Sequence, residues 1–131
     1  MFYDIIQAGR STGTEKDNIY IRMGIMAEQK KPDTGQTWVM HEDVLAEKMP
    51  TWTKRRVMAH GEDMMLVENE FFTGDTAPKH THPHTQITYV ISGALKFTVD
   101  GESRVLRDGD SVFIRPHAEH SAVAVEDSLI I

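Results

Sequence analysis

The sequence contains no cysteine, and this absence excludes several kinds of chemistry. Without thiols there is no cysteine nucleophile, no Cys-ligated zinc, no iron–sulfur cluster and no disulfide. Long apolar runs are lacking as well: no stretch approaches the ~20 residues that cross a bilayer, and no signal-peptide core stands near the start. We therefore expect a protein of a reducing compartment, the cytoplasm, that does not insert into membranes.

Basic residues are outnumbered, since 14 lysines and arginines face 20 aspartates and glutamates, a net charge of −6 with neutral histidine. This balance opposes attraction to nucleic-acid phosphates and to anionic membranes, so we expect neither as a partner. The length of 131 residues favours one domain and excludes a second catalytic domain. A chain of this size buries roughly two-thirds of its unfolded surface, which supports a single core without disulfides.

The composition and the hydrophobic pattern divide the chain into an N-terminal extension, residues 1–40, and a domain over residues 41–131. The extension is polar and rich in turn residues, with one candidate strand over residues 18–26. Because a lone strand is not stable, this strand needs a partner surface. The chain that follows is long enough to cross a small subunit, so we expect a homodimer in which the strand is exchanged.

From residue 54 onward, short apolar segments alternate with turn signals every eight to twelve residues, a rhythm typical of an antiparallel sandwich or barrel. Asp100-Gly101 predicts a two-residue hairpin turn. Leu95, Phe97 and Val99 share one face of an alternating segment and are predicted to line the core. A helical turn or two is possible within residues 41–48. The fold class is all-β, with strands predicted over residues 56–60, 64–72, 86–91, 94–99, 102–106, 111–114, 121–125 and 128–131.

Five of the seven histidines lie between His80 and His120. Side chains of equal parity point the same way in an extended chain, so His80, His82 and Gln86 can converge, with His120 supplied by a later strand. Imidazole nitrogens and an amide oxygen suit a divalent transition metal, namely zinc, nickel, iron or manganese. These four residues include no carboxylate or thiolate, so a bound ion would keep its full +2 charge and favour an anionic ligand.

Five residues match the spacing of the first motif of a known family: Gly74, His80, His82, Gln86 and Gly93. At one of these positions, Gln86 stands in place of the usual glutamate. A second, looser match runs through Gly109, Pro116 and His120. On these residues the sequence resembles the cupin superfamily from about residue 41 to the C-terminus. The resemblance implies a cupin double-stranded β-helix, or jelly-roll, barrel with an N-terminal extension. It also implies a metal near one mouth of the barrel, held by His80, His82, Gln86 and His120.

Within that superfamily, residues 80–93 are most similar to the small single-domain cupins of pectin and uronate degradation, which open the ring of an unsaturated uronate. They are also similar to the cupin cyclases of aromatic polyketide pathways, which use a glutamine at the same ligand position. Both groups imply redox-neutral chemistry in which the metal acts as a Lewis acid on a small anionic substrate. The uronate group also carries an aspartate and an arginine on the strand after the position of Ile131, where this sequence ends.

Two other functions stay open at this point: a dioxygenase using Fe(II) and O2, and a non-catalytic cupin that binds a small ligand or metal. The general acid or base is also open, with four candidates in the sequence: His84, Tyr89, Glu68 and Glu70. Each of these residues also has a non-catalytic interpretation. His84 and the two glutamates could simply be exposed to solvent, and Tyr89 could serve in packing. Arg115 and Lys79 are candidates to receive a substrate carboxylate at the mouth.

Overall fold

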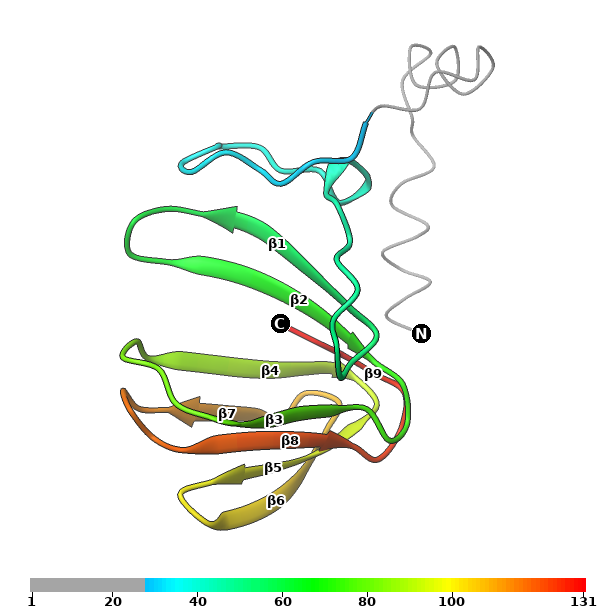
Figure 1. Cartoon of the computed structure of the whole chain (residues 1–131), viewed down its shortest axis with the longest axis vertical. Coiled ribbons are helices and arrows are strands. Elements are labelled where there is room, and N and C mark those ends of the chain that lie inside the picture. Colours follow the sequence, from blue (N-terminus) through cyan, green and yellow to red (C-terminus); the bar gives the residue numbers. More distant parts are fainter. Residues whose placement is uncertain (1–27) are drawn as a thin grey trace.

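The computed structural model describes residues 28–131. These residues form two antiparallel sheets that face each other as a jelly-roll barrel, which confirms the predicted all-β fold (Figure 1). The strand orders are β1-β2-β9-β4-β7 in one sheet and β3-β8-β5-β6 in the other. The elements are η1 (His41–Asp43), β1 (Lys54–His60), β2 (Met65–Phe71), β3 (Thr76–His80), β4 (Gln86–Ser92), β5 (Ala94–Val99), β6 (Glu102–Arg107), β7 (Ser111–Ile114), β8 (His120–Ala124) and β9 (Ser128–Ile130).

The strands predicted from residue 54 onward all form, and their ends agree with the structure to within two residues. One further strand, β3, was not predicted, because Pro78 at its centre argues against a ladder position. The structure tolerates Pro78 because β3 is an edge strand, and its pairing with β8 shifts register between Ala77 and His80. The predicted helical region within residues 41–48 is reduced to the single 3-10 turn η1.

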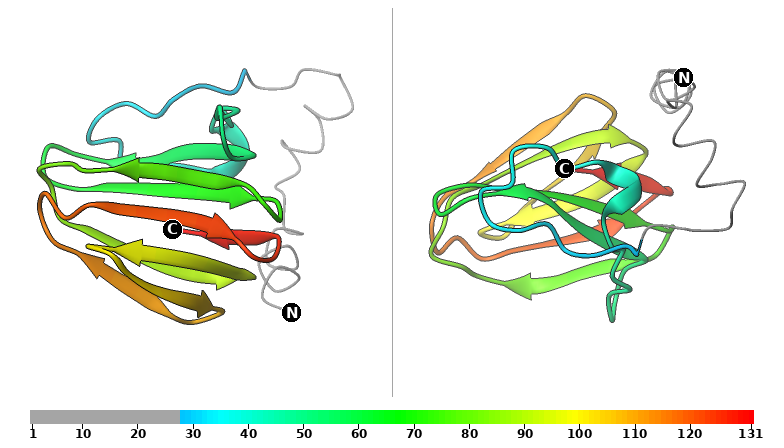
Figure 2. Two further views of the ribbon diagram at one scale, coloured as in Figure 1. Left: turned by 60° about the horizontal axis from the view of Figure 1, so that its bottom comes forward. Right: turned by 90° about the horizontal axis from the view of Figure 1, so that it is seen from above.

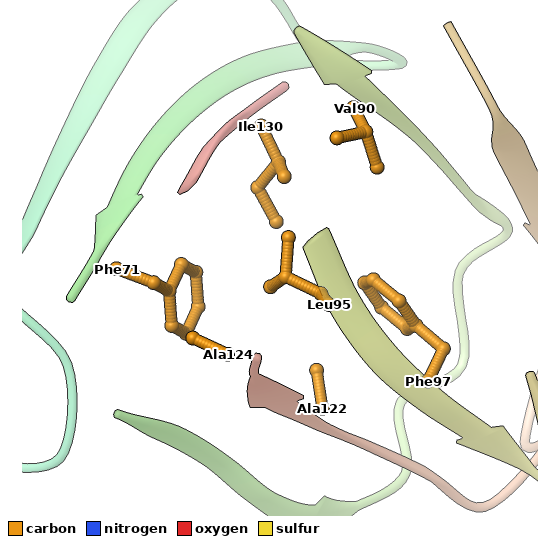
Figure 3. Close-up of a cluster of buried hydrophobic side chains, with 7 residues drawn as sticks. All are labelled: Phe71, Val90, Leu95, Phe97, Ala122, Ala124 and Ile130. Carbon is orange, nitrogen blue, oxygen red and sulfur yellow. The ribbon is translucent and has the colours of Figure 1, made fainter. Parts of the chain in front are cut away.

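The core lies between the two sheets and consists of inward-facing side chains from both (Figure 3). Its buried members are Phe71, Val90, Leu95, Phe97, Ala122, Ala124 and Ile130. Leu95 and Phe97 are buried as predicted, and Val99 is half-buried at the end of β5. Val90 pairs in register with Ile130. Because Val90 faces inward, Gln86 and Thr88 on the same strand also face the barrel interior.

One end of the barrel carries the turns that join β1 to β2, β3 to β4, β5 to β6 and β7 to β8, at the left in Figure 1. We call this end the mouth. The β5–β6 turn confirms the predicted hairpin, since Asp100 and Gly101 have φ values of 47° and 87°. Positive φ at both central residues is what a type I′ turn requires. Two of these connections, β1–β2 and β5–β6, are hairpins, whereas β3–β4 and β7–β8 cross from one sheet to the other, and all four lie around one opening.

The described part of the N-terminal region, residues 28–53, lies against the side of the barrel formed by β1 (Figures 1 and 2). The Gly35 N–H donates to the His60 carbonyl over 2.8 Å, and Glu47 forms an antiparallel bridge with Arg55. The strand predicted over residues 18–26, and its exchange between subunits, lie outside the described residues and stay predictions. No helix in residues 28–131 is long and apolar enough to span a bilayer.

Candidate functional site

Three strand ends and one loop bring the predicted residues together at the mouth. His80 ends β3 and His120 begins β8, and the two are direct register partners. His82 lies two residues beyond β3, and Gln86 begins β4. The ligand atoms offered by the three histidines all lie within 4.8 Å of one another. We call His80, His82 and His120 the histidine cluster, which is the convergence that the sequence pattern predicts.

Each ring of the histidine cluster is oriented by its own local backbone. The Nδ1 atom of His80 lies 2.7 Å from the Pro78 carbonyl oxygen, that of His82 lies 2.9 Å from the oxygen of His84, and that of His120 lies 2.9 Å from the oxygen of Ala118. Because a carbonyl oxygen only accepts hydrogen bonds, each Nδ1 must carry the proton. The Nε2 atom of each ring is thereby left for a ligand, as in metal sites whose imidazoles are fixed by an outer partner.

His120 is the most buried ring of the cluster, with 3% of its surface exposed. Burial is the main cause that lowers its pKa, and the neighbouring imidazoles of His80 and His82 lower it further, against the opposing effect of the hydrogen bond to the Ala118 carbonyl. Its Nε2 atom is buried and has no partner among the described residues. A buried lone pair without a donor is costly, and a cation would satisfy it. The histidine cluster therefore fits a divalent transition metal.

Gln86 joins the cluster through its side-chain amide. Its Oε1 atom lies 2.9 Å from Nε2 of His82, and its Nε2 atom donates to Oγ1 of Thr88 over 2.9 Å. Thr88 is 3% exposed, inside the barrel. Gln86 is a predicted residue of the site, whereas Thr88 is not. Thr88 could have been found from the sequence, because residues two apart on a strand face the same side and Thr88 follows Gln86 by two.

Two loop residues hold His82 in place. The ring of His84 stacks on that of His82 with centroids 3.8 Å apart and an interplanar angle of 2°. His84 is largely exposed and lies outside the three-histidine group. The pKa of its imidazole is lowered, first by the part of the ring that is removed from water and second by the neighbouring His82. On the other side, the backbone N–H of His117 donates to the His82 carbonyl over 2.8 Å. This bond ties the β7–β8 loop to the β3–β4 loop, a link that no sequence pattern indicates.

The remaining candidates at the mouth are engaged elsewhere. Tyr89 is 45% exposed and lies on the outer face of β4, because the buried residues on either side of it face inward, so the packing interpretation is wrong. Arg115 donates to Asp100 over 2.8 Å, and Lys79 lies 2.8 Å from a carboxylate oxygen of Glu119. All four of these charged side chains are largely exposed. Both predicted carboxylate receivers are therefore already paired with an acid.

Glu68 and Glu70 lie on the face of β2 opposite the core residue Phe71. The expectation that they are exposed is wrong, because Arg56 of β1 covers them. Its Nη1 atom donates to Glu68 over 2.9 Å and to Glu70 over 3.1 Å, and His41 donates to Glu68 over 2.9 Å. We call these four residues the ion-pair network. It holds the N-terminal region against the sheet and does not join the histidine cluster.

Two facing antiparallel sheets with imidazoles gathered at one mouth define a cupin, and this chain belongs to the cupin superfamily. The family model described as Cupin domain matches residues 70–130. Among curated proteins, the chain is similar to the pectin degradation protein KdgF of Dickeya dadantii (strain 3937). The two are 29% identical over 86 residues, which cover 65% of this chain and 78% of that protein.

Solved structures show the same relationship. The structure of KdgF from Halomonas sp. is 32% identical, with a TM-score of 0.68, and the match covers 72% of this chain and 88% of that one. An RmlC-like cupin from Shewanella frigidimarina NCIMB 400 is 30% identical, with a TM-score of 0.70, and the match covers 73% and 86% of the two chains. The predicted membership of the cupins, near the pectin-degradation proteins, is confirmed.

Proposed function

We propose that this chain is a metal-dependent cupin enzyme that acts on a small sugar acid by redox-neutral chemistry, as in the opening of a uronate ring. The observation that carries the proposal is the convergence of three imidazoles whose Nδ1 atoms are all occupied by backbone carbonyls. The substrate class is supported by the similarity to two KdgF proteins, one of them named for pectin degradation.

The proposed ligand set for one divalent transition metal, such as zinc, nickel, iron or manganese, is His80, His82, Gln86 and His120. A bound ion would supply Lewis-acid polarisation of a carbonyl or hemiacetal oxygen. All four donors are neutral, so the protein leaves the ion's +2 charge undiminished. This charge replaces Lys79 and Arg115 as the main attraction for an anionic substrate, because both of those cations are paired with acids.

The chain's own residues then orient and enclose the substrate. The backbone carbonyls that accept from the three imidazoles fix the ring planes before any ligand arrives. Among the candidates to act on the substrate, which also include Arg115 and Tyr89, only His84 contacts the histidine cluster in the described part of the chain. We assign to its exposed imidazole the transfer of a proton at the substrate.

The test combines metal analysis with turnover of an unsaturated uronate, followed by the loss of the ultraviolet absorbance of its conjugated double bond. We expect one equivalent of metal and metal-dependent turnover in the wild type, and neither in His82→Ala. His60→Ala is the matched control, since His60 contacts Thr34 and the Met58 carbonyl instead of the cluster. Oxygen uptake by the iron-loaded protein would instead support a dioxygenase. Tight ligand binding without turnover would support a binding protein.

We propose further that the protein is a homodimer in which residues 18–26 pair with the neighbouring subunit. The support is the apolar pattern of Ile19, Ile21, Ile25 and Met26, which needs a partner surface. Sedimentation of the full-length protein should give the mass of a dimer, and Ile21→Asp should shift it toward the monomer. A stable dimer in both proteins would show that this segment does not join the subunits.

A further inference from the structure

Thr88 is a buried polar residue without a role in the ligand set just proposed. It lies at the centre of β4 with 3% of its surface exposed, and its Oγ1 atom accepts from the side-chain amide of Gln86. The contact determines which end of that amide faces the histidine cluster. With Nε2 held by Thr88, Oε1 is the atom that lies 2.9 Å from His82 Nε2.

This arrangement is unfavourable without a third partner. His82 carries its proton on Nδ1, where it donates to the His84 carbonyl, so its unprotonated Nε2 atom is an acceptor. Gln86 Oε1 is also an acceptor, and two lone pairs facing each other at this distance repel. A cation bound to both atoms removes the repulsion.

The alternative is a half-turn of the amide, after which Gln86 Nε2 donates to His82 Nε2. Thr88 fits this state too, because its hydroxyl both donates and accepts and can then donate to Oε1. A residue with a donor alone, or with no polar group, would fit at most one of the two orientations. The hydroxyl of Thr88 thus has the chemistry that both states of the amide need.

We propose that Thr88 is a positioning residue that sets the orientation of the Gln86 amide. It holds Oε1 toward the histidine cluster when a metal is bound, and it accepts the reversed amide when the metal is absent. The inference rests on the ligand set given under the proposed function. Thr88 acts through Gln86 and does not itself contact the metal.

The experiment measures Co²⁺ affinity by calorimetric titration and the visible d–d absorption of the bound ion, in the full-length protein. Thr88→Val keeps the shape but removes the hydroxyl, so that the buried amide loses its acceptor. We expect affinity to fall about 10-fold or more, the usual cost of losing an outer partner of a metal ligand, with a changed spectrum. Thr88→Ser should restore both. Thr88→Ala, which adds no methyl group, should repeat the loss if Thr88→Val folds poorly.

A matched control is Thr98→Val, which removes another threonine hydroxyl with a single side-chain partner, Ser103. It should leave the affinity and the spectrum unchanged. The decisive comparison uses Gln86→Ala as background. If Thr88 acts through Gln86, Thr88→Val causes no further loss there, and the two substitutions are strongly non-additive.

An equal loss in both backgrounds would overturn the inference, and so would full affinity with an unchanged spectrum in Thr88→Val. These outcomes are separable from failure of the proposed function. Metal binding without turnover of a uronate would refute the function and leave the role of Thr88 standing. Absence of Co²⁺ binding in the wild type would refute both.

Discussion

The ion-pair network on the five-stranded sheet and the histidine cluster at the mouth differ in how their polar atoms are matched. In the ion-pair network, a guanidinium donates to two carboxylates of opposite charge, and an imidazole donates to one of them, so donors meet acceptors. In the histidine cluster and the neighbouring Gln86, the Nε2 atoms and the amide oxygen are all acceptors. The carboxylates of the first group have their donors, whereas the acceptors of the second need a cation.

Each group also contains a buried nitrogen without a partner, Nε of Arg56 in one and Nε2 of His120 in the other. The two are not equivalent. Arg56 already donates to both carboxylates through Nη1, so its charge is compensated. His120 has only its Nδ1 bond, and its free atom is an acceptor that no donor reaches in residues 28–131. What distinguishes the candidate metal site from the structural ion-pair network is therefore a lack of hydrogen-bond donors for its acceptor atoms, more than burial itself.

The largest effect expected from this comparison is the loss of metal binding in His82→Ala. Removal of one donor of four should lower metal affinity by more than the roughly 100-fold that an outer partner contributes. The free energy of unfolding without metal should change little, because His82 lies in a loop at the mouth and not in the core. Metal content per subunit and urea unfolding measure the two effects. Wild-type metal content in this variant would refute the ligand assignment.

Arg56→Met should have the opposite pattern, with loss of stability and intact metal binding. It leaves two carboxylates, 16% and 30% exposed, without their shared cation. Breaking a fully buried pair costs 3–5 kcal/mol, and the partial exposure reduces this to about 2 kcal/mol. Urea unfolding measures the loss. The control is Arg104→Met, whose ion pair with Glu102 is exposed and should contribute less than about 1 kcal/mol. Equal effects of the two substitutions would show that the half-buried ion-pair network contributes no more stability than an exposed ion pair.

The histidine cluster was predictable from the sequence because the spacing of its residues matches a motif. The expected reason, a single extended segment over His80, His82 and Gln86, is wrong: the chain turns between β3 and β4, and these residues converge because the turn and both strand ends lie at the mouth. His120 comes from a distant strand, and the match to the second cupin motif supported its place beside the others. The hydrogen bond from His117 to the His82 carbonyl could not be predicted, since it depends on how two loops meet at the mouth.

The ion-pair network was missed for a different reason. Sequence alone indicates that Glu68 and Glu70 share one face of a strand, and exposure is the usual state of such carboxylates. Their burial depends on the register of β1 against β2, which places Arg56 opposite Glu68, and on the N-terminal region that brings His41. Strand β3 was missed because the tolerance for Pro78 depends on its position at a sheet edge. In each case the deciding fact is a long-range pairing.

Gln86→Glu sharpens the comparison by adding a charge to the neutral ligand set. The carboxylate should raise metal affinity on the order of tenfold, because it attracts the cation directly. It should also weaken the binding of an anionic ligand to the metal-loaded protein, since the site then carries one positive charge less. Titration with metal, and then with a small sugar acid, measures both. An unchanged response to ligand charge would show that Gln86 does not face the metal.

Asp75 is a carboxylate stabilised by neutral hydrogen-bond donors instead of a cation, and its substitution gives the smallest expected effect on stability. The hydroxyl of Thr53, and after it the backbone N–H of Phe72, hold the pKa of the Asp75 carboxyl below its usual range, with no cation needed. Because the folded-state pKa is depressed, the unfolded chain binds more protons between the two pKa values. The stabilisation is therefore fully present above the unfolded value of about 3.9 and is lost as the pH falls through the folded value.

Asp75→Asn should accordingly be slightly less stable than the wild type at neutral pH, and the difference should shrink as the pH is lowered below about 4. Asparagine keeps the size and an acceptor oxygen but loses the charge, so the charge-assisted part of the two hydrogen bonds disappears. Thermal unfolding of both proteins, measured without metal between pH 7 and pH 3, gives the difference directly. Thr53→Val should reproduce part of the effect, because it removes the first of the two donors. A difference that grows toward low pH would mean that the folded protein prefers the protonated acid, and that Asp75 is not held by its donors.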